Sequence, residues 1–446
     1  MLRHTHTTRN RIRALFVSSI LFLLMAFAFA ACNSTAAGPT DAPVTLEPTR
    51  VARPAGTTAV AATLAPGQVP TSTPVLYDAE GNPIPPVPQA KPLLMKSPAY
   101  SVQAFLWYRV EQADRDLTLI QNMGFSWVKQ EFAWRDMEGA GKGAFDWSHS
   151  DQVIIAANRK KLDLLARIDN SPDWAAPGCF SVEKSTMGPP AKTQDWVDFL
   201  KAFATRYKQR VRAYEIWNEP NLSREWCNRP PSPSEYAKFL QASYQAIKSV
   251  DPNAMIISGG LTPTTCCSDG GQAMPDGLFF QKMYEAMGKK SDGYFDVLGV
   301  HAAGFKAEPE ADPGVVAQDP VLTNNDPSSP DLKRIYSFRH VEDIRKIMVQ
   351  YGDTNKQIVI TEFGWTSDQV NPAYAWFRVD ENTKADRIVR AYQYAKAHWA
   401  PWIGAMSLIY IASPDWTNKD EKYWWAITNP DGTTRPAYDA LKAMPK

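Results

Sequence analysis

The sequence predicts an α/β protein whose folded domain is a (β/α)8 TIM barrel. Three observations favour this fold: eight short apolar runs typical of strands, amphipathic helical stretches between them, and enough chain from Pro98 onward to hold eight such units. A barrel of this kind takes about 250 residues, and more when its loops carry insertions. The alternative is an open doubly wound sheet. No Gly-rich GxGxxG turn follows the first predicted strand, so the nucleotide-binding form of that sheet lacks its signature.

The strands are expected where four to seven mostly apolar residues lie between polar or helical segments. In chain order they cover residues 102–106, 127–132, 162–168, 213–217, 255–258, 297–301, 357–361 and 405–409. Helices are expected between them, ended by Gly or by Asp-Pro. Examples are residues 113–123, 195–207, 234–250, 336–351 and 382–399. Strand and helix therefore alternate as a barrel requires.

Two glutamates follow strands of this predicted barrel. Glu219 comes after the fourth strand in Ile-Trp-Asn-Glu-Pro-Asn, and Glu362 comes after the seventh in Ile-Thr-Glu-Phe-Gly-Trp. Barrels carry their functional groups at the carboxyl ends of the strands, so both side chains should face one mouth. A carboxylate in such a setting is costly unless it is paired. Two carboxyls facing one substrate bond are typical of glycoside hydrolysis.

The two glutamate motifs resemble those of the clan of retaining glycoside hydrolases, a cellulase-like superfamily. The resemblance runs from about Pro98 to Pro445 and is nearest to family 39, then to family 5. It implies that Glu219 is the acid/base and Glu362 the nucleophile. One carboxyl must start protonated and the other ionised, and neighbouring carboxylates push their pKa values apart. Retention would place the carboxyls roughly 5 to 5.5 Å apart.

Six further residues are predicted to bind the substrate. Asn218 resembles the asparagine of the clan that binds the sugar 2-hydroxyl, although Asn also caps turns. His301 ends the sixth strand, where it would contact the substrate or orient Glu362; a lone histidine is more often structural. Lys129 takes the place of an arginine common in related enzymes, and its alternative is an ordinary solvated lysine. The other three are aromatic candidates for sugar stacking: Trp134, Trp365 and Tyr410.

Some choices stay open at the site. Either Tyr410 or Trp416 could form the sugar platform after the eighth strand. Glu215 shares its strand with the acid/base motif and is expected to point into the barrel as a partner for another group. Glu131 is a candidate substrate contact or support. No metal and no organic cofactor is expected.

Composition excludes some classes of protein. Hydrophobic residues make up 44% and charged residues 21%, which is ordinary for a protein with a large core. The formal net charge is +1. Removing the four arginines of the first 31 residues leaves 44 basic against 47 acidic residues, a net charge of −3. With no basic stripe left, a nucleic-acid surface is not expected.

The amino terminus has the pattern of an export signal. A basic stretch precedes an apolar run that ends at Phe29-Ala30-Ala31-Cys32, which resembles a bacterial lipobox. We expect a signal peptide at residues 1–31 and lipid on Cys32, with an uncleaved anchor or plain secretion as alternatives. Residues 32–97, rich in Pro, Thr and Ala, are expected to be a disordered tether, and residues 98–446 the catalytic domain. The protein would then lie in the cell envelope, on the outer side of the bacterial membrane.

Four cysteines remain in the exported part of the chain. They lack the spacing of a zinc site, and an oxidising compartment allows three pairings. We favour Cys179 with Cys227, which leaves Cys266 and Cys267 as a vicinal pair; free thiols are the alternative.

The leading functional hypothesis is a monomeric retaining glycosidase acting on a poly- or oligosaccharide. The alternatives are a catalytically inactive carbohydrate-binding barrel lipoprotein and a passive envelope lipoprotein, since a fold alone does not establish chemistry. Sugar, linkage and endo or exo action do not follow from the sequence.

Overall fold

The computed structural model describes residues 76–77, 83–84, 94–107, 109–181, 186–267 and 271–446. The chain divides into two units, and residues 31–88 form the smaller one. In that unit, strands β1 (Leu76–Tyr77) and β2 (Pro83–Ile84) pair antiparallel. They fall within the expected tether, whereas the signal segment and Cys32 lie outside the described residues. All other helices and strands belong to the larger unit.

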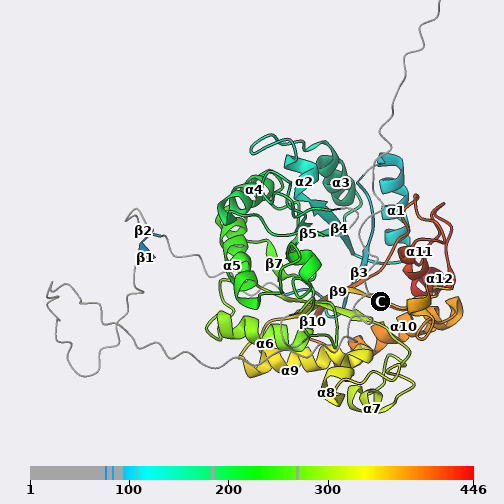
Figure 1. Ribbon diagram of the computed structural model, residues 1–446. Helices are drawn as coiled ribbons and strands as arrows, with labels where there is room; N and C mark the ends of the chain where they lie inside the picture. Colours follow the sequence, from blue (N-terminus) through cyan, green and yellow to red (C-terminus); the bar gives the residue numbers. More distant parts are fainter. Residues whose placement is uncertain (1–75, 78–82, 85–93, 108, 182–185, 268–270) are drawn as a thin grey trace, which may run out of the picture. The chain divides into compact units, whose positions relative to one another are not determined.

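Eight parallel strands form the centre of the larger unit, which confirms the predicted TIM barrel. They are β3 (Ala99–Gln103), β4 (Trp127–Ala133), β5 (Asp163–Asp169), β6 (Ala213–Ile216), β7 (Met255–Ser258), β8 (Leu298–Ala303), β9 (Ile358–Gly364) and β10 (Ile403–Leu408). Their spatial order is β7-β6-β5-β4-β3-β10-β9-β8. A parallel bridge between Ile257 and Val297 joins the two outer strands. Figure 1 shows the strands inside a ring of helices.

Two strand predictions need correction. The first strand begins at Ala99, three residues before its predicted start, because its inward positions are small or polar and do not stand out as an apolar run. The seventh strand continues to Gly364. Glu362 therefore lies inside β9, where a register shift against β8 sets it opposite His301.

The long helices cover the outside of the barrel. They are α1 (Val110–Asn122), α3 (Ser148–Arg159), α4 (Thr193–Arg206), α5 (Pro233–Val250), α6 (Asp276–Ala286), α9 (Val341–Gln350), α10 (Glu381–His398) and α12 (Pro436–Ala443). Short helices in the loops are α2 (Trp134–Glu138), α7 (Pro313–Gln318), α8 (Pro330–Lys333) and α11 (Glu421–Trp425). The 3-10 turns are η2 (Ser223–Trp226), η3 (Arg334–Tyr336), η4 (Phe338–His340) and η5 (Pro372–Tyr374). Within the described residues, no helix is both long and apolar enough to cross a membrane.

Local sequence explains where the helices begin. Ser232 caps α5 by accepting a hydrogen bond from the amide of Glu235, with proline at the first helical position. The single helix predicted over residues 336–351 is wrong in its first part. Ser337 has extended backbone and its side chain accepts from the amide of Arg339, so η3 and η4 precede α9. Serine favours such turns because its hydroxyl replaces a backbone acceptor.

The barrel interior changes from apolar to charged along the strands. Its lower layer is one apolar cluster: Met95, Ala99, Trp127, Leu165, Ala213, Met255, Ile257, Val297, Val359 and Ala405. Two residues further along β4, β5 and β6 the inward positions are Lys129, Arg167 and Glu215, all fully buried. The apolar floor thus supports a layer of buried charges below the mouth.

One half-buried histidine joins two of the outer helices. His340 lies 3.0 Å from Asp276 at the start of α6 and 3.3 Å from Asp343 in α9. Burial lowers the pKa of His340, but the two aspartates more than offset this and raise it to about 9. The imidazolium form therefore holds α6 and α9 together at neutral pH.

Candidate active site

Glu362 lies at the centre of the charged layer. Its Oε1 atom is 3.4 Å from Lys129 Nζ and 3.3 Å from Arg167 Nη1. All three side chains are buried, so water screens these contacts little. Glu362 is therefore the carboxyl group that two buried cations of the barrel interior share.

Lys129 has no exposed surface, which rules out the alternative of a solvated lysine. Its ammonium group lies 2.9 Å from Glu215 Oε2 and donates to the carbonyl oxygen of Thr361 at 3.0 Å. Burial raises the pKa of Glu215, but Lys129 and then His301 and Arg167 offset this and lower it overall. Lys129 therefore bridges two buried carboxylates, and Glu215 is the interior partner that strand alternation predicts.

Arg167 on β5 is a site residue that sequence reasoning missed. Besides Glu362, its guanidinium contacts Glu131 at 2.7 Å and Asp169 at 2.9 Å. It also donates to the side-chain oxygen of Asn218 at 3.3 Å. Arg167 thus joins the nucleophile candidate to the residue that precedes Glu219. The available signal was alternation: Arg167 and Asp169 are charged residues two apart, so they share one side of β5.

The loop that carries Glu219 leaves β6 through unusual backbone. Trp217 and Glu219 both have positive φ, +71° and +41°, which costs free energy in non-glycine residues and is common at functional sites. Asn221 secures the loop: its side chain donates to the carbonyls of Thr262 and Met274 and accepts from the amide of Thr262. The strained turn is therefore fixed by hydrogen bonds to the loop after β7.

Gly260 allows that loop to approach β8 and β9. Its carbonyl accepts from the amide of Glu219 at 3.0 Å. A Cβ atom at this position would lie 2.3 Å from the His301 ring and from the Thr361 hydroxyl. Only glycine fits here, because real Cβ atoms do not come that close to other heavy atoms.

Glu219 is held by two groups. Arg224 Nη2 lies 2.5 Å from its Oε2 atom, and His301 Nδ1 lies 3.2 Å from its Oε1 atom. Burial raises the pKa of Glu219, but Arg224, His301 and a hydrogen bond from Thr262 outweigh it and lower the pKa to about 2. In this arrangement Glu219 is a carboxylate. His301 contacts Glu219, so in this structure it orients the acid/base candidate and not Glu362.

Two buried side-chain nitrogen atoms at the mouth lack partners among the described residues. They are Nδ2 of Asn218, whose oxygen binds Arg167, and Nε2 of His301, whose other nitrogen contacts Glu219. Buried polar atoms are rarely left unpaired in folded proteins. The free amide of Asn218 can donate to an acceptor on a bound ligand.

The three predicted aromatic contacts lie in different settings. Trp134 begins α2, is fully buried among Trp174, Trp196 and Phe199, and donates to Glu138. Such an indole has no free face for a sugar, so its packing role replaces the stacking role that we expected.

Trp365 follows β9 and is also fully buried. It packs on Phe338, and a Cβ on Gly304 would overlap its ring at 2.0 Å. Its ring faces are therefore covered by protein. Here too the structure replaces stacking with packing, although Trp365 Nε1 is buried without a partner among the described residues.

Tyr410, just after β10, lies beside the site. Burial, and after it the negative charge of Glu362, raises the pKa of Tyr410. Its ring packs against Phe105 and Trp416, with centroids 5.5 and 5.4 Å away. Lys422 of α11 lies over Phe105 and Trp416 at 5.7 and 5.8 Å. Phe105, Tyr410 and Trp416 therefore form one aromatic wall. The two candidate platform residues, Tyr410 and Trp416, lie side by side in it.

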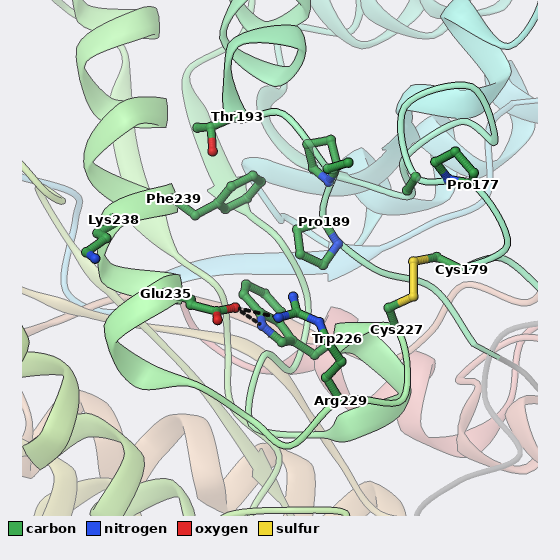
Figure 2. Close-up of a pocket in the computed structure, with 13 residues that line it drawn as sticks. Pro177, Cys179, Pro189, Thr193, Trp226, Cys227, Arg229, Glu235, Lys238 and Phe239 are labelled. Carbon is green, nitrogen blue, oxygen red and sulfur yellow. Dashed lines mark hydrogen bonds and ion pairs between the residues drawn. A yellow bond between two sulfur atoms is a disulfide. The ribbon is translucent and has the colours of Figure 1, made fainter.

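The cysteines pair as predicted. Disulfides join Cys179 to Cys227 and Cys266 to Cys267. The first one borders a cavity of about 460 Å³ (Figure 2). Trp226 and Arg229 donate to Glu235 across this cavity, at 3.0 Å each. It lies beyond the loop that carries Arg224 and does not include either catalytic candidate.

No group of three or more His, Cys, Asp or Glu in the described ranges has the geometry of a metal site. The side chains around Glu219 and Glu362 are instead paired carboxylates and cations. This donor set suits acid–base and nucleophilic chemistry on a bound hydroxylated ligand.

Comparison with known proteins assigns most of the chain to a family. The family model "Cellulase (glycosyl hydrolase family 5)" matches residues 77–409. A β-xylosidase from Geobacillus stearothermophilus is 26% identical over 140 residues, which cover 29% of this chain and 27% of the xylosidase.

Solved structures support the same fold. A family 39 glycoside hydrolase from the gut symbiont Bacteroides cellulosilyticus WH2 superposes with a TM-score of 0.54 at 18% identity, over 78% of this chain and 63% of that enzyme. A GH5_18 protein from Streptomyces cattleya, solved in complex with GlcNAc, gives 0.52 at 11% identity, over 78% of this chain and 79% of that one. The chain spans less than two thirds of the xylosidase and of the Bacteroides enzyme.

Proposed function

Because the chain belongs to the cellulase family, glycosyl hydrolase family 5, we propose that it is a glycosidase that cleaves O-glycosidic bonds of a poly- or oligosaccharide with retention of configuration. The glutamate motifs predicted this clan, although they put family 39 ahead of family 5. Identity to the xylosidase is confined to 140 residues, so the sugar and the linkage are not carried over from it.

One observation carries the proposal: two buried glutamates from different strands share one mouth and are linked through Arg167 and Asn218. Glu362 is paired with Lys129 and Arg167, which suits a nucleophile that must attack an anomeric carbon as a carboxylate. Glu219 would give a proton to the leaving oxygen and later take one from water.

The unpaired amide of Asn218 supports a sugar ligand. Asn218 Nδ2 is buried and lacks an acceptor among the described residues. Sugar hydroxyls supply acceptors, and a hydrogen bond to the 2-hydroxyl gains strength as charge develops in the transition state. Of the three rings in the aromatic wall, Phe105 is the one that is half-buried, since Tyr410 and Trp416 are 2% and 7% exposed; Phe105 is therefore the ring of this wall with apolar surface for a sugar.

The experiment compares Glu362→Gln, Glu219→Gln and the surface control Glu285→Gln on aryl glycosides and on a glycan panel. We expect the first variant to lose about 10⁴-fold or more in kcat, as removal of a catalytic group does. Glu219→Gln should retain turnover of substrates with good leaving groups and regain rate with azide. Proton NMR of the first-formed product should report the original anomer.

The other outcomes discriminate clearly. If both variants cleave glycans as fast as the parent, the glycosidase proposal is wrong. Binding of glycans without cleavage by the parent would favour the inactive carbohydrate-binding barrel, and an inverted product would exclude double displacement.

We also propose that the protein works outside the cytoplasm, anchored by lipid on Cys32. The support is the sequence pattern at residues 29–32 and the two disulfides, which suit an oxidising compartment. A Cys32→Ala variant should lose incorporation of labelled fatty acid and leave the membrane fraction. Unchanged labelling would refute the anchor.

A further inference from the structure

Arg224 forms an ion pair with Glu219, the acid/base candidate. Its Nη2 atom is 2.5 Å from Glu219 Oε2, and its Nε atom is 3.2 Å from Glu225 Oε1. The two glutamate side chains are 2% exposed, whereas that of Arg224 is 16% exposed. Arg224 therefore pairs with two buried carboxyl groups and is itself partly exposed.

This contact conflicts with the first step of the proposed reaction. A proton donor must carry a proton on the carboxyl that meets the leaving oxygen, and Arg224 competes with that proton for Glu219. The lowered pKa of Glu219 agrees with this geometry. Arg224 must therefore move away before Glu219 can act as an acid.

The backbone around Arg224 is fixed, so only its side chain can move. The carbonyl of Arg224 accepts from the amide of Met187, and the amide of Cys227 donates back to the Met187 carbonyl. The Cys179–Cys227 disulfide closes the same region. A long side chain on a rigid base suits a switch between two acceptors.

Glu225 alone does not compensate Arg224. Burial raises the pKa of Glu225 to about 7, so it carries only part of a charge at neutral pH. If Arg224 left Glu219 and paired with no other anion, its guanidinium would be an unpaired charge in a largely buried place. Neutral sugar hydroxyls are weaker acceptors than the carboxylate they would replace. The new partner should itself be an anion.

We infer that Arg224 is a specificity-determining residue that selects a glycan with a carboxylate, a uronic acid unit, on the leaving-group side of the scissile bond. The carboxylate of the substrate binds the Arg224 guanidinium through two parallel hydrogen bonds, which suit its planar geometry. Glu219, freed and close to other carboxylates, takes one proton from solvent and gives it to the leaving oxygen. The inference rests on the proposed function, because it assigns Glu219 as the proton donor.

The test uses the full chain and pairs of glycans that differ in one feature. Uronic acid polysaccharides such as glucuronoxylan, hyaluronan and homogalacturonan are each compared with their carboxyl-reduced forms by kcat/KM. The variants are Arg224→Gln, Arg224→Lys and the control Arg229→Gln, an exposed arginine of the same loop that pairs with Glu235.

We expect the parent to prefer at least one carboxylated glycan over its reduced form by about 10- to 100-fold, the range for one charge-assisted pair. Arg224→Gln should abolish the preference, and Arg224→Lys should keep part of it. Arg224→Gln should also cleave the reduced form faster than the parent does, because Glu219 is then free to hold a proton. A folding defect cannot produce that gain.

Equal cleavage of both members of every pair by the parent would overturn this inference alone. So would an unchanged preference in Arg224→Gln. Failure to cleave any glycan or aryl glycoside would instead overturn the proposed function, and the inference with it.

Discussion

Replacing Lys129 by methionine tests the charged layer most directly. The ammonium group lies 2.9 Å from Glu215 and 3.4 Å from Glu362. At an effective dielectric constant of ~20 these contacts are worth about 6 and about 5 kcal/mol, partly cancelled by several kcal/mol for desolvating the lysine. Because the variant leaves the buried Glu215 without its ion-pair partner and Glu362 with Arg167 alone, the free energy of unfolding should fall by about 3–5 kcal/mol.

The assay is urea unfolding at pH 7 followed by circular dichroism, with Lys201→Met on the exposed face of α4 as control. The double variant Lys129→Met/Glu215→Gln should be more stable than Lys129→Met, because it removes a stranded charge. The pKa of Glu215 is lowered in the folded state, so its ionised form stabilises the protein above pH 4.5 and this contribution is lost on acidification. The deficit of Lys129→Met should therefore shrink at acid pH.

Two results would refute this reasoning. One is a loss below about 1 kcal/mol for Lys129→Met, which would mean that water or movement of the carboxylates compensates the charge. The other is a double variant whose loss equals the sum of the two single losses, since that would show no coupling between Lys129 and Glu215.

Three further predictions use other parts of the fold. Gly260→Ala should lower both stability and kcat, because the added Cβ would lie 2.3 Å from the His301 ring. The control Gly277→Ala in α6 meets no atom closer than 3.7 Å and should leave kcat unchanged. Unchanged stability and kcat in Gly260→Ala would contradict the packing. The pKa of His340 is raised to about 9, so its contribution to the free energy of unfolding is complete below pH 6.5 and is lost as the pH rises through 9. Urea unfolding across this pH range should show that His340→Gln removes up to about 3 kcal/mol of the pH-dependent stability. Identical pH profiles for the parent and the variant would refute this role. Asn221→Ala breaks three hydrogen bonds of the loop after β6 and should lower the free energy of unfolding by about 3 kcal/mol, with a large fall in kcat. A loss of stability with full kcat would show that the loop holds Glu219 in place without Asn221.

The amino-acid sequence by itself determined the barrel and identified both glutamates, whereas for the cysteines it left three pairings open and favoured the one that the structure has. These features depend on local pattern: alternating strands and helices, and short motifs whose chemistry is carried by neighbouring residues. Element ends were less certain, as Ala99 and Ser337 illustrate, because polar inward positions and a serine turn leave no apolar signal.

Only the tertiary structure decided which charges surround the two glutamates. Arg167 and Arg224 meet them through contacts between different strands and loops, and the alternation that places Arg167 on one side of β5 does not show which carboxyl it pairs with. The same limit explains Trp134 and Trp365, whose burial depends on neighbours distant in sequence. The sequence identified the two glutamates, and the fold placed Lys129, Arg167 and Arg224 beside them, because contacts between distant segments form only when the chain folds.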